Sequence, residues 1–282
     1  MPCRATGVHV AHASVGEAHT GTTMADGVRS LPMERVALFV TCVGEVLEPD
    51  VPTAAVRVLR AAGADVEVPE GQTCCGQPAW NAGFAPDAAR VARASLAALA
   101  AAGDADVIVP AGSCAAMIRL YWPVLFDTVD DATSAAAARR LTPRVHELTE
   151  WLAGRDLPPA STSPCTVAYH RSCHMERELG VHDQPTDLLA GIDGCTVAPW
   201  SSDDRCCGFG GTFSVTLPEV SAAMADERLD SLPEGVTEIV GADASCLLQL
   251  RTRAQARRLP VRTRHIAEVL ADALPARDEV PR

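Results

Sequence analysis

The sequence predicts an α/β protein of two tandem units, each a small parallel sheet flanked by helices and related to the other by a pseudo-two-fold axis. Three observations support this fold class. Short β-branched runs alternate with alanine-rich stretches of helical length, which is the pattern of a parallel sheet covered by helices. The chain has 282 residues, enough for two domains of ordinary size. A set of four cysteines occurs twice with nearly the same spacing.

Each set consists of a vicinal cysteine pair with a single cysteine on either side. The members are Cys42, Cys74, Cys75 and Cys114 in the first half, and Cys173, Cys206, Cys207 and Cys246 in the second. The last cysteine follows its pair by 39 positions in both halves, and the first precedes its pair by 32 or 33. A glycine, Gly76 or Gly208, follows each pair. Such a repeat indicates a duplicated unit.

The first unit begins with an apolar strand that ends just before Cys42. The helix after it has Pro52 in its first turn and Gly63 just beyond its end, where these residues favour helix termini. A second strand leads to the cysteine pair, a long helix stops at Gly103, and a third strand leads to Cys114. The expected strands are 36–40, 65–68 and 106–109, and the expected helices are 51–62, 87–102, 115–125 and 135–152.

A linker over 156–164 separates the units, because three prolines and three hydroxyl residues in nine positions favour neither helix nor strand. The same order of elements then resumes. The expected strands are 166–169, 195–198, 238–240 and 261–263, and the expected helices are 219–232, one that follows Cys246 and ends at Arg258, and 266–274. We therefore expect domains over 33–155 and 165–275. Residues 1–32, polar and without periodicity, are predicted to be a disordered extension, with Met33 as an alternative start.

In this order, each cysteine of the two sets lies just beyond the carboxyl end of a strand or in the turn after it. Open parallel sheets bind their ligands at that edge. We therefore expect the four thiols of each half to meet in space, although they are far apart in the sequence.

Composition excludes several classes of function. The formal net charge is −12 and every basic residue is arginine, so nucleic acid and anionic membranes are not expected partners. No stretch has the length and apolarity of a transmembrane segment. No charged segment followed by an apolar one precedes the first strand. We expect a cytoplasmic protein, in which cysteine clusters bind metal or carry out redox chemistry.

Thiolates are soft ligands that select zinc, copper(I) or iron–sulfur clusters. Structural zinc sites typically use paired ligands two to four residues apart, and no CxxC occurs here. Adjacent cysteines suit a polynuclear cluster, in which neighbouring sulfurs can bind different iron atoms. Gly76 and Gly208 fit this interpretation, because glycine adopts positive φ and lets backbone amides approach a cofactor. Zinc in one or both sites, and a thiol–disulfide reductase that uses the vicinal pairs, are alternatives.

Two histidines break the symmetry of the repeat. His170 and His174 flank the first cysteine of the second set, where the first half has Phe39 and Val43. Each could be a ligand or a proton relay at the second site, or could steady a loop through hydrogen bonds. His265 is expected to begin the last helix. No catalytic residue is identified.

Several stretches also carry a family resemblance. They are 38–42, 69–72, 74–79, 112–114, 169–170, 172–175, 206–215 and 265–270. They resemble the cysteine-rich CCG domain that occurs in heterodisulfide reductases and in the glycolate oxidase iron–sulfur subunit. They are still more similar to the family of lactate utilization protein A, which has two CCG domains. The resemblance extends from Met33 to the last helix.

The resemblance implies an iron–sulfur electron-transfer subunit of a three-protein system that oxidises L-lactate to pyruvate. Its partners would be lactate utilization proteins B and C, and the eight cysteines would hold one cluster per domain, of the 4Fe–4S type. A role with another 2-hydroxy acid, or a heterodisulfide-reductase-like one, is an alternative. The fuller CCG pattern ends in CxxC, whereas Met117 and Gln249 stand in those last positions here and leave four cysteines per site.

Overall fold

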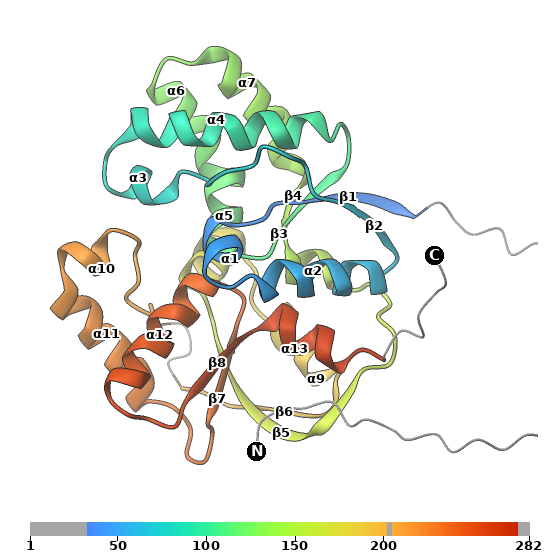
Figure 1. Ribbon diagram of the computed structural model, residues 1–282, viewed down its shortest axis with the longest axis vertical. Helices are drawn as coiled ribbons and strands as arrows, with labels where there is room; N and C mark the ends of the chain where they lie inside the picture. Colours follow the sequence, from blue (N-terminus) through green and yellow to red (C-terminus); the bar gives the residue numbers. More distant parts are fainter. Residues whose placement is uncertain (1–32, 202–204, 276–282) are drawn as a thin grey trace, which may run out of the picture.

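Two four-stranded parallel sheets carry the fold of residues 33–201 and 205–275, the part of the chain that the computed structural model describes (Figure 1). The first sheet has the strand order β2-β1-β3-β4, and the second repeats it as β6-β5-β7-β8. Every neighbouring pair of strands is parallel. The predicted α/β class, with one small parallel sheet in each half, is confirmed. The extension predicted over 1–32 lies outside the described residues.

The strands match the prediction closely, with one omission. They are β1 Glu34–Leu38, β2 Ala64–Glu67, β3 Asp106–Val109, β4 Val145–Glu147, β5 Ser161–His170, β6 Asp193–Ala198, β7 Glu238–Gly241 and β8 Arg262–His265. The prediction of one helix over 135–152 is wrong, because Pro143 lies in a 3₁₀ turn that ends the helix, and β4 follows it. The predicted linker is also shorter than expected, because Ser161 already pairs with Asp193.

The helices of the first half are α1 Cys42–Val46, α2 Asp50–Ala61, α3 Gln77–Asn81, α4 Ala85–Ala101, α5 Gly112–Ala116, α6 Trp122–Thr128, α7 Ala132–Leu141 and α8 Leu148–Leu152. Those of the second are α9 Gln184–Ala190, α10 Phe213–Thr216, α11 Pro218–Asp230, α12 Ala244–Ala256 and α13 Ile266–Ala273. A π-helix, η1 Met117–Tyr121, divides the helix predicted over 115–125, and a second one, η3 Met175–Leu179, follows Cys173. Such turns are rare and occur often at functional sites.

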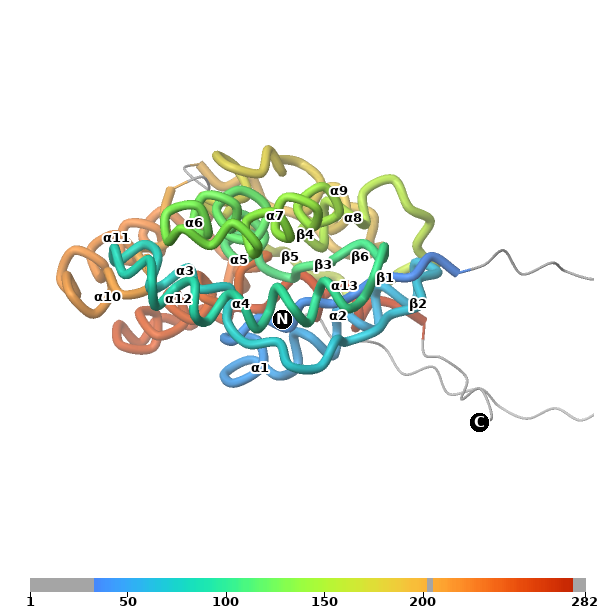
Figure 2. Tube along the Cα trace, turned by 90° about the horizontal axis from the view of Figure 1, so that it is seen from above, coloured from blue at the N-terminus to red at the C-terminus, as the bar shows by residue number. Residues whose placement is uncertain are grey.

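The two halves pack through exchanged contacts. Helix α13 of the second half packs against α2 of the first, and α8 of the first half packs against α9 of the second. In the same way α5 contacts η3, and α12 contacts α1. In the repeat α2 corresponds to α9, and α13 corresponds to α8. Likewise α5 corresponds to α12, and η3 corresponds to α1. The contacts therefore come in equivalent pairs, as a pseudo-two-fold axis requires. Figures 1 and 2 show α2 and α13 side by side, although they come from opposite ends of the described chain.

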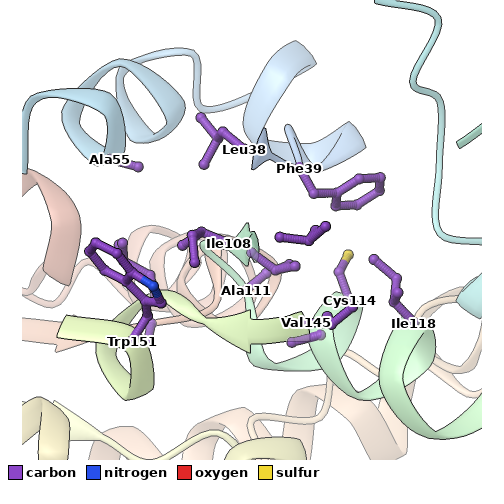
Figure 3. Close-up of a cluster of buried hydrophobic side chains, with 14 of the residues drawn as sticks. Leu38, Phe39, Ala55, Ile108, Ala111, Cys114, Ile118, Val145 and Trp151 are labelled. Carbon is purple, nitrogen blue, oxygen red and sulfur yellow. The ribbon is translucent and has the colours of Figure 1, made fainter. Parts of the chain in front are cut away.

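One large hydrophobic core extends through both halves. It contains Val36 and Ile108 from the first sheet together with Val167, Ile266 and Leu270 from the second half. Figure 3 shows part of this core, in which Cys114 lies among apolar side chains that include Phe39 and Ile118. A smaller cluster surrounds the second cysteine pair. The shared core fixes the two halves, and with them the two cysteine sets, relative to each other. Within residues 33–201 and 205–275, no helix has the length and apolarity that crossing a membrane requires.

Candidate metal centres

The first four cysteines meet at the carboxyl edge of the first sheet. Cys42 begins α1, Cys74 and Cys75 lie in the loop between β2 and α3, and Cys114 lies in α5. The Sγ atoms of Cys42 and Cys74 are 3.6 Å apart, and those of Cys75 and Cys114 are 3.4 Å apart. The vicinal pair joins the two contacts into one group, which we call quartet 1. The predicted convergence of these thiols is confirmed.

Side-chain hydrogen bonds to the backbone hold the loop of quartet 1 in place. Gln72 accepts from Val40 N at 2.9 Å and donates to Leu38 O at 2.9 Å, which ties the loop to the end of β1. The Trp122 indole donates to Cys75 O at 2.8 Å. Gly76 has φ 88°, and a Cβ there would lie 2.8 Å from a backbone oxygen of α4. Only glycine fits this turn.

The sulfurs of quartet 1 share protons. A hydrogen bond from Cys42 lowers the pKa of Cys74 to about 3, helped by the amide of Gly76, which donates to Cys74 Sγ at 3.4 Å. The same contact raises the pKa of Cys42. A hydrogen bond to Cys114, together with complete burial, raises the pKa of Cys75. The hydrogen bonds within quartet 1 therefore favour the thiolate form of Cys74.

The second four cysteines form an equivalent group, quartet 2. Cys173 hydrogen-bonds Cys206, and Cys207 hydrogen-bonds Cys246. The contact with Cys173 lowers the pKa of Cys206 to about 2. The Gly208 amide donates to Cys206 Sγ at 3.4 Å, as Gly76 does in the first half. The repeat in the sequence therefore corresponds to a repeat in space.

Gln249, which stands at the last cysteine position of the fuller CCG pattern, supports the turn at Gly208. Gly208 has φ 85°, and a Cβ there would lie 2.5 Å from Ser221 O. The Ser221 hydroxyl donates to Gly208 O at 2.7 Å and accepts from Gln249 Nε2 at 2.8 Å. Gln249 thus supports the turn that presents the cysteine pair. In the first half, Met117 at the corresponding position is fully buried in the core.

His170 lies beside quartet 2. One of its ring nitrogens lies within 4.8 Å of the Sγ atoms of Cys207 and Cys246, and the three groups form a possible metal site. Arg228, fully buried, lies 3.4 Å from His170 Nδ1 and stacks on Trp200 at 3.7 Å. Burial, and then the charge of Arg228, lower the pKa of His170 to about 3. The imidazole is therefore neutral, and its Nε2 has no hydrogen-bond partner among the described residues.

His174 links quartet 2 to the first half. Its Nδ1 lies 3.6 Å from Cys173 Sγ, and its Nε2 lies 3.2 Å from Nε2 of Gln77, one residue after the first cysteine pair and its glycine. Both residues line a cavity of about 170 Å³, which all four cysteines of quartet 2 also line. Ser113 and Asn81 of the first half also line this cavity. Quartet 2 is thus completed by residues from the opposite half.

Asp243 joins the two cysteine-bearing helices. Its Oδ1 accepts from Ser245 N at 3.2 Å and so caps α12, which carries Cys246. Its Oδ2 accepts at 2.9 Å from Ser113 N in α5, which carries Cys114. The Asp243 side chain is 2% exposed, so a buried carboxylate joins the helices that carry Cys114 and Cys246.

The donor set fits a thiophilic metal or cluster. Four sulfurs converge in each half, and Cys75, Cys114, Cys207 and Cys246 are buried. Buried thiolates without a counter-charge are costly, and a bound cation removes that cost. The glycine amides aimed at Cys74 and Cys206 supply the outer hydrogen bonds that such centres use. Cys195, on β6, lies outside both quartets.

Comparison with known proteins agrees with this geometry. The CCG family, described as a cysteine-rich domain, matches residues 36–119 and 167–251, and each stretch contains one complete quartet. Lactate utilization protein A of Exiguobacterium sp. is 40% identical over 245 residues, which cover 86% of this chain and 99% of that protein. The protein of the same name from Geobacillus kaustophilus is 40% identical over 242 residues, covering 84% and 98%. The chain belongs to the lactate utilization protein A family. It contains two CCG domains.

A solved structure supports the fold alone. The crystal structure of a hypothetical protein from Helicobacter pylori superimposes with a TM-score of 0.59 over 88% of this chain, at 12% sequence identity. The chain spans half the length of that protein.

Two residues at this site were not predicted from the sequence. Each of them breaks the repeat. Asp243 stands where the first half has Ala111. Arg228 lies seven residues after Ser221, which contacts the second glycine turn, and Ser95 lies seven residues after Ala88, which contacts the first. The signal that could have found them was the same one that singled out His170 and His174. His265 caps α13 through its Nδ1, as the sequence predicted.

Proposed function

We propose that this protein is an iron–sulfur electron-transfer subunit of a system that oxidises L-lactate to pyruvate. The observation that carries the proposal is the convergence of four thiols in each half, with a vicinal pair at the centre of each quartet. The relatives are named lactate utilization protein A, and 40% identity over nearly their whole length supports the same role here. Lactate utilization proteins B and C are the partners we propose.

The chemistry agrees with two centres in one chain. Oxidation of a 2-hydroxy acid to a 2-keto acid releases two electrons and two protons. An iron–sulfur cluster takes up and releases single electrons, so one cluster in each quartet would accommodate both. Quartet 1 would be held by Cys42, Cys74, Cys75 and Cys114, and quartet 2 by Cys173, Cys206, Cys207 and Cys246, with His170 and His174 beside it and Gly76 and Gly208 shaping the two turns.

The test is the metal content of protein purified without air. We expect brown protein with iron and acid-labile sulfide in equal amounts, and visible absorption that bleaches on reduction. Cys75→Ser and Cys207→Ser should each remove about half of the iron, because each breaks one quartet. Cys195→Ser, outside both quartets, is the matched control and should keep the wild-type content. A colourless protein, or iron that survives both substitutions, would refute the proposal.

A second candidate has one observation in its favour. A Zn–S bond of about 2.3 Å places two sulfurs of a tetrahedral site about 3.8 Å apart, close to the 3.6 and 3.4 Å pairs of quartet 1. Two zinc ions would make the protein a scaffold for partner subunits and not an electron carrier. The same purification distinguishes the two: about two zinc ions per chain and no sulfide would establish the scaffold.

A further inference from the structure

The two quartets are built alike, but their surroundings carry different charges and hydrogen-bond donors. Beside Cys42 the first half has the apolar Val43, whereas beside Cys173 the second half has His174. On the helix behind each cysteine pair, Ser95 of the first half is replaced by the buried cation Arg228. These two differences place positive or hydrogen-donating groups at quartet 2. Asp243, which stands where the first half has Ala111, acts against them, because its carboxylate lies near Cys173 and Cys246.

The orientation of Gln77 fixes the position of the proton on His174. Gln77 Nε2 lies 3.0 Å from Ser113 O, which can only accept a hydrogen bond, so the nitrogen of the amide and not its oxygen must face this carbonyl. The second hydrogen of that nitrogen points to His174 Nε2 at 3.2 Å. His174 Nε2 is therefore an acceptor, and the ring carries its hydrogen on Nδ1.

The Nδ1–H group of His174 faces a cysteine sulfur. Nδ1 lies 3.6 Å from Cys173 Sγ, within the range of N–H···S contacts. The chain of contacts therefore runs from the CCG loop of the first half, through Gln77 and the imidazole, to a sulfur of quartet 2. At the matching position of quartet 1 the Val43 side chain offers no donor, and Cys42 accepts a hydrogen bond from the Val43 backbone amide alone.

We infer that His174, held in this tautomer by Gln77 of the opposite half, donates a hydrogen bond to the Cys173 thiolate and makes the second centre the more easily reduced of the two. This inference rests on the proposed function. Reduction adds one electron and no proton to a centre, and a hydrogen bond to a ligating sulfur stabilises the added negative charge. The buried charge of Arg228 acts in the same direction. One electron would then pass from the centre at quartet 1, which is oxidised, to the centre at quartet 2, which is reduced.

The test is a redox titration of the iron-loaded protein, followed by EPR. We expect two reduction waves, of which the one at higher potential is lost in Cys207→Ser. His174→Val copies the first half. It should lower the midpoint potential of this wave by at least about 59 mV, which for one electron is a tenfold change in the reduction equilibrium. The midpoint potential of the other wave should not change. His182→Val is the matched control, because the His182 side chain is exposed and its ring pairs with Glu176.

A double-mutant comparison tests the part played by Gln77. Gln77→Leu should lower the midpoint potential of the same wave by less than His174→Val does. In the His174→Val background, Gln77→Leu should have no further effect on that potential. Two results would overturn the inference but not the proposed function. One is that the potential shifts of the two substitutions add. The other is that His174→Val leaves the midpoint potential unchanged at full iron content. Absence of iron from the wild-type protein would refute the proposed function itself.

A measurement on the wild-type protein tests the tautomer without requiring that any variant folds. ¹⁵N NMR of the histidine rings in zinc-loaded, diamagnetic protein identifies the tautomer directly. We expect His174 to be protonated on Nδ1, and a proton on Nε2 would overturn the inference.

Discussion

At the scale of single residues, quartet 2 differs from quartet 1 at positions that the repeat otherwise keeps alike. Phe39 is replaced by His170, and Val43 by His174. Phe39 belongs to the apolar core, whereas His170 places a neutral, buried imidazole beside two sulfurs. The duplicated scaffold therefore gives the two quartets different surroundings.

His170→Phe copies the first half and should weaken the second centre selectively. The substitution removes the ring nitrogen that faces the sulfurs of Cys207 and Cys246, and it removes the contact with Arg228. Loss of a hydrogen bond at a buried charged group costs about 1–3 kcal/mol. We therefore expect a lower free energy of unfolding in urea and loss of metal from quartet 2 before quartet 1.

The control for this substitution is His182→Phe, at an exposed histidine. Metal analysis of His170→Phe combined with Cys75→Ser isolates the second centre. Unchanged metal content and unchanged unfolding would show that His170 is only a packing residue.

At the scale of elements, the last helix of each half begins with the same motif. Glu147 caps α8 and His265 caps α13, and in each case a glutamate three residues later, Glu150 or Glu268, completes a capping box. The strand before each motif, β4 or β8, belongs to the same repeat. The second of these strands was predicted and the first was not, because the alanine-rich run before β4 looks helical in isolation.

Glu147 makes stability depend on pH. Burial raises its pKa to about 7, from 4.5, so the folded protein keeps a proton that the unfolded chain releases. The folded state binds more protons between these two values, and the free energy of unfolding therefore falls as pH rises from 4.5 to 7. At 1.36 kcal/mol per pKa unit the total is about 3 kcal/mol.

Glu147→Gln should remove this dependence, because the amide cannot ionise and its oxygen can still accept from Thr149 N. We expect the variant to gain about 3 kcal/mol relative to the wild type between pH 4.5 and 8, measured by urea unfolding at each pH. The exposed Glu234→Gln is the control and should follow the wild-type curve. Parallel curves for Glu147→Gln and the wild type would contradict the assignment.

At the scale of the whole molecule, the two halves share one core and depend on close approach at their boundary. Gly112 of α5 shows how tight this boundary is, because a Cβ there would lie 2.3 Å from Met175 Cγ in η3. Asp243 and Arg57 also reach across it, to Ser113 N and Ala271 O. The cavity beside quartet 2, which Gln77 and Ser113 of the first half line, therefore forms only when both halves are in place.

Gly112→Ala should destabilise the protein by about 1–3 kcal/mol through overpacking. Met175→Ala should relieve the clash, so that adding Gly112→Ala to it costs clearly less than in the wild type. Gly191→Ala is the matched control, since a Cβ there meets its nearest atom at 3.5 Å. Equal cost of Gly112→Ala in both backgrounds, measured by urea unfolding, would contradict this account of the boundary.

The sequence by itself determined the α/β class, the duplication and the convergence of each quartet. These follow from local order: a strand, a cysteine just beyond its carboxyl end, and a helix that returns to the next parallel strand. Cys42, Cys75 and Cys114 meet because three such units share one sheet. Nothing in this argument requires knowledge of the other half.

Only the tertiary structure decided how the two halves meet, and with that the surroundings of quartet 2. Gln77 reaches His174, and Asp243 caps a helix of the first half, because α2 packs on α13 and α8 packs on α9. Those contacts depend on the relative placement of two separately formed sheets. Spacing along the chain sets positions within one sheet and carries no information on the distance between two.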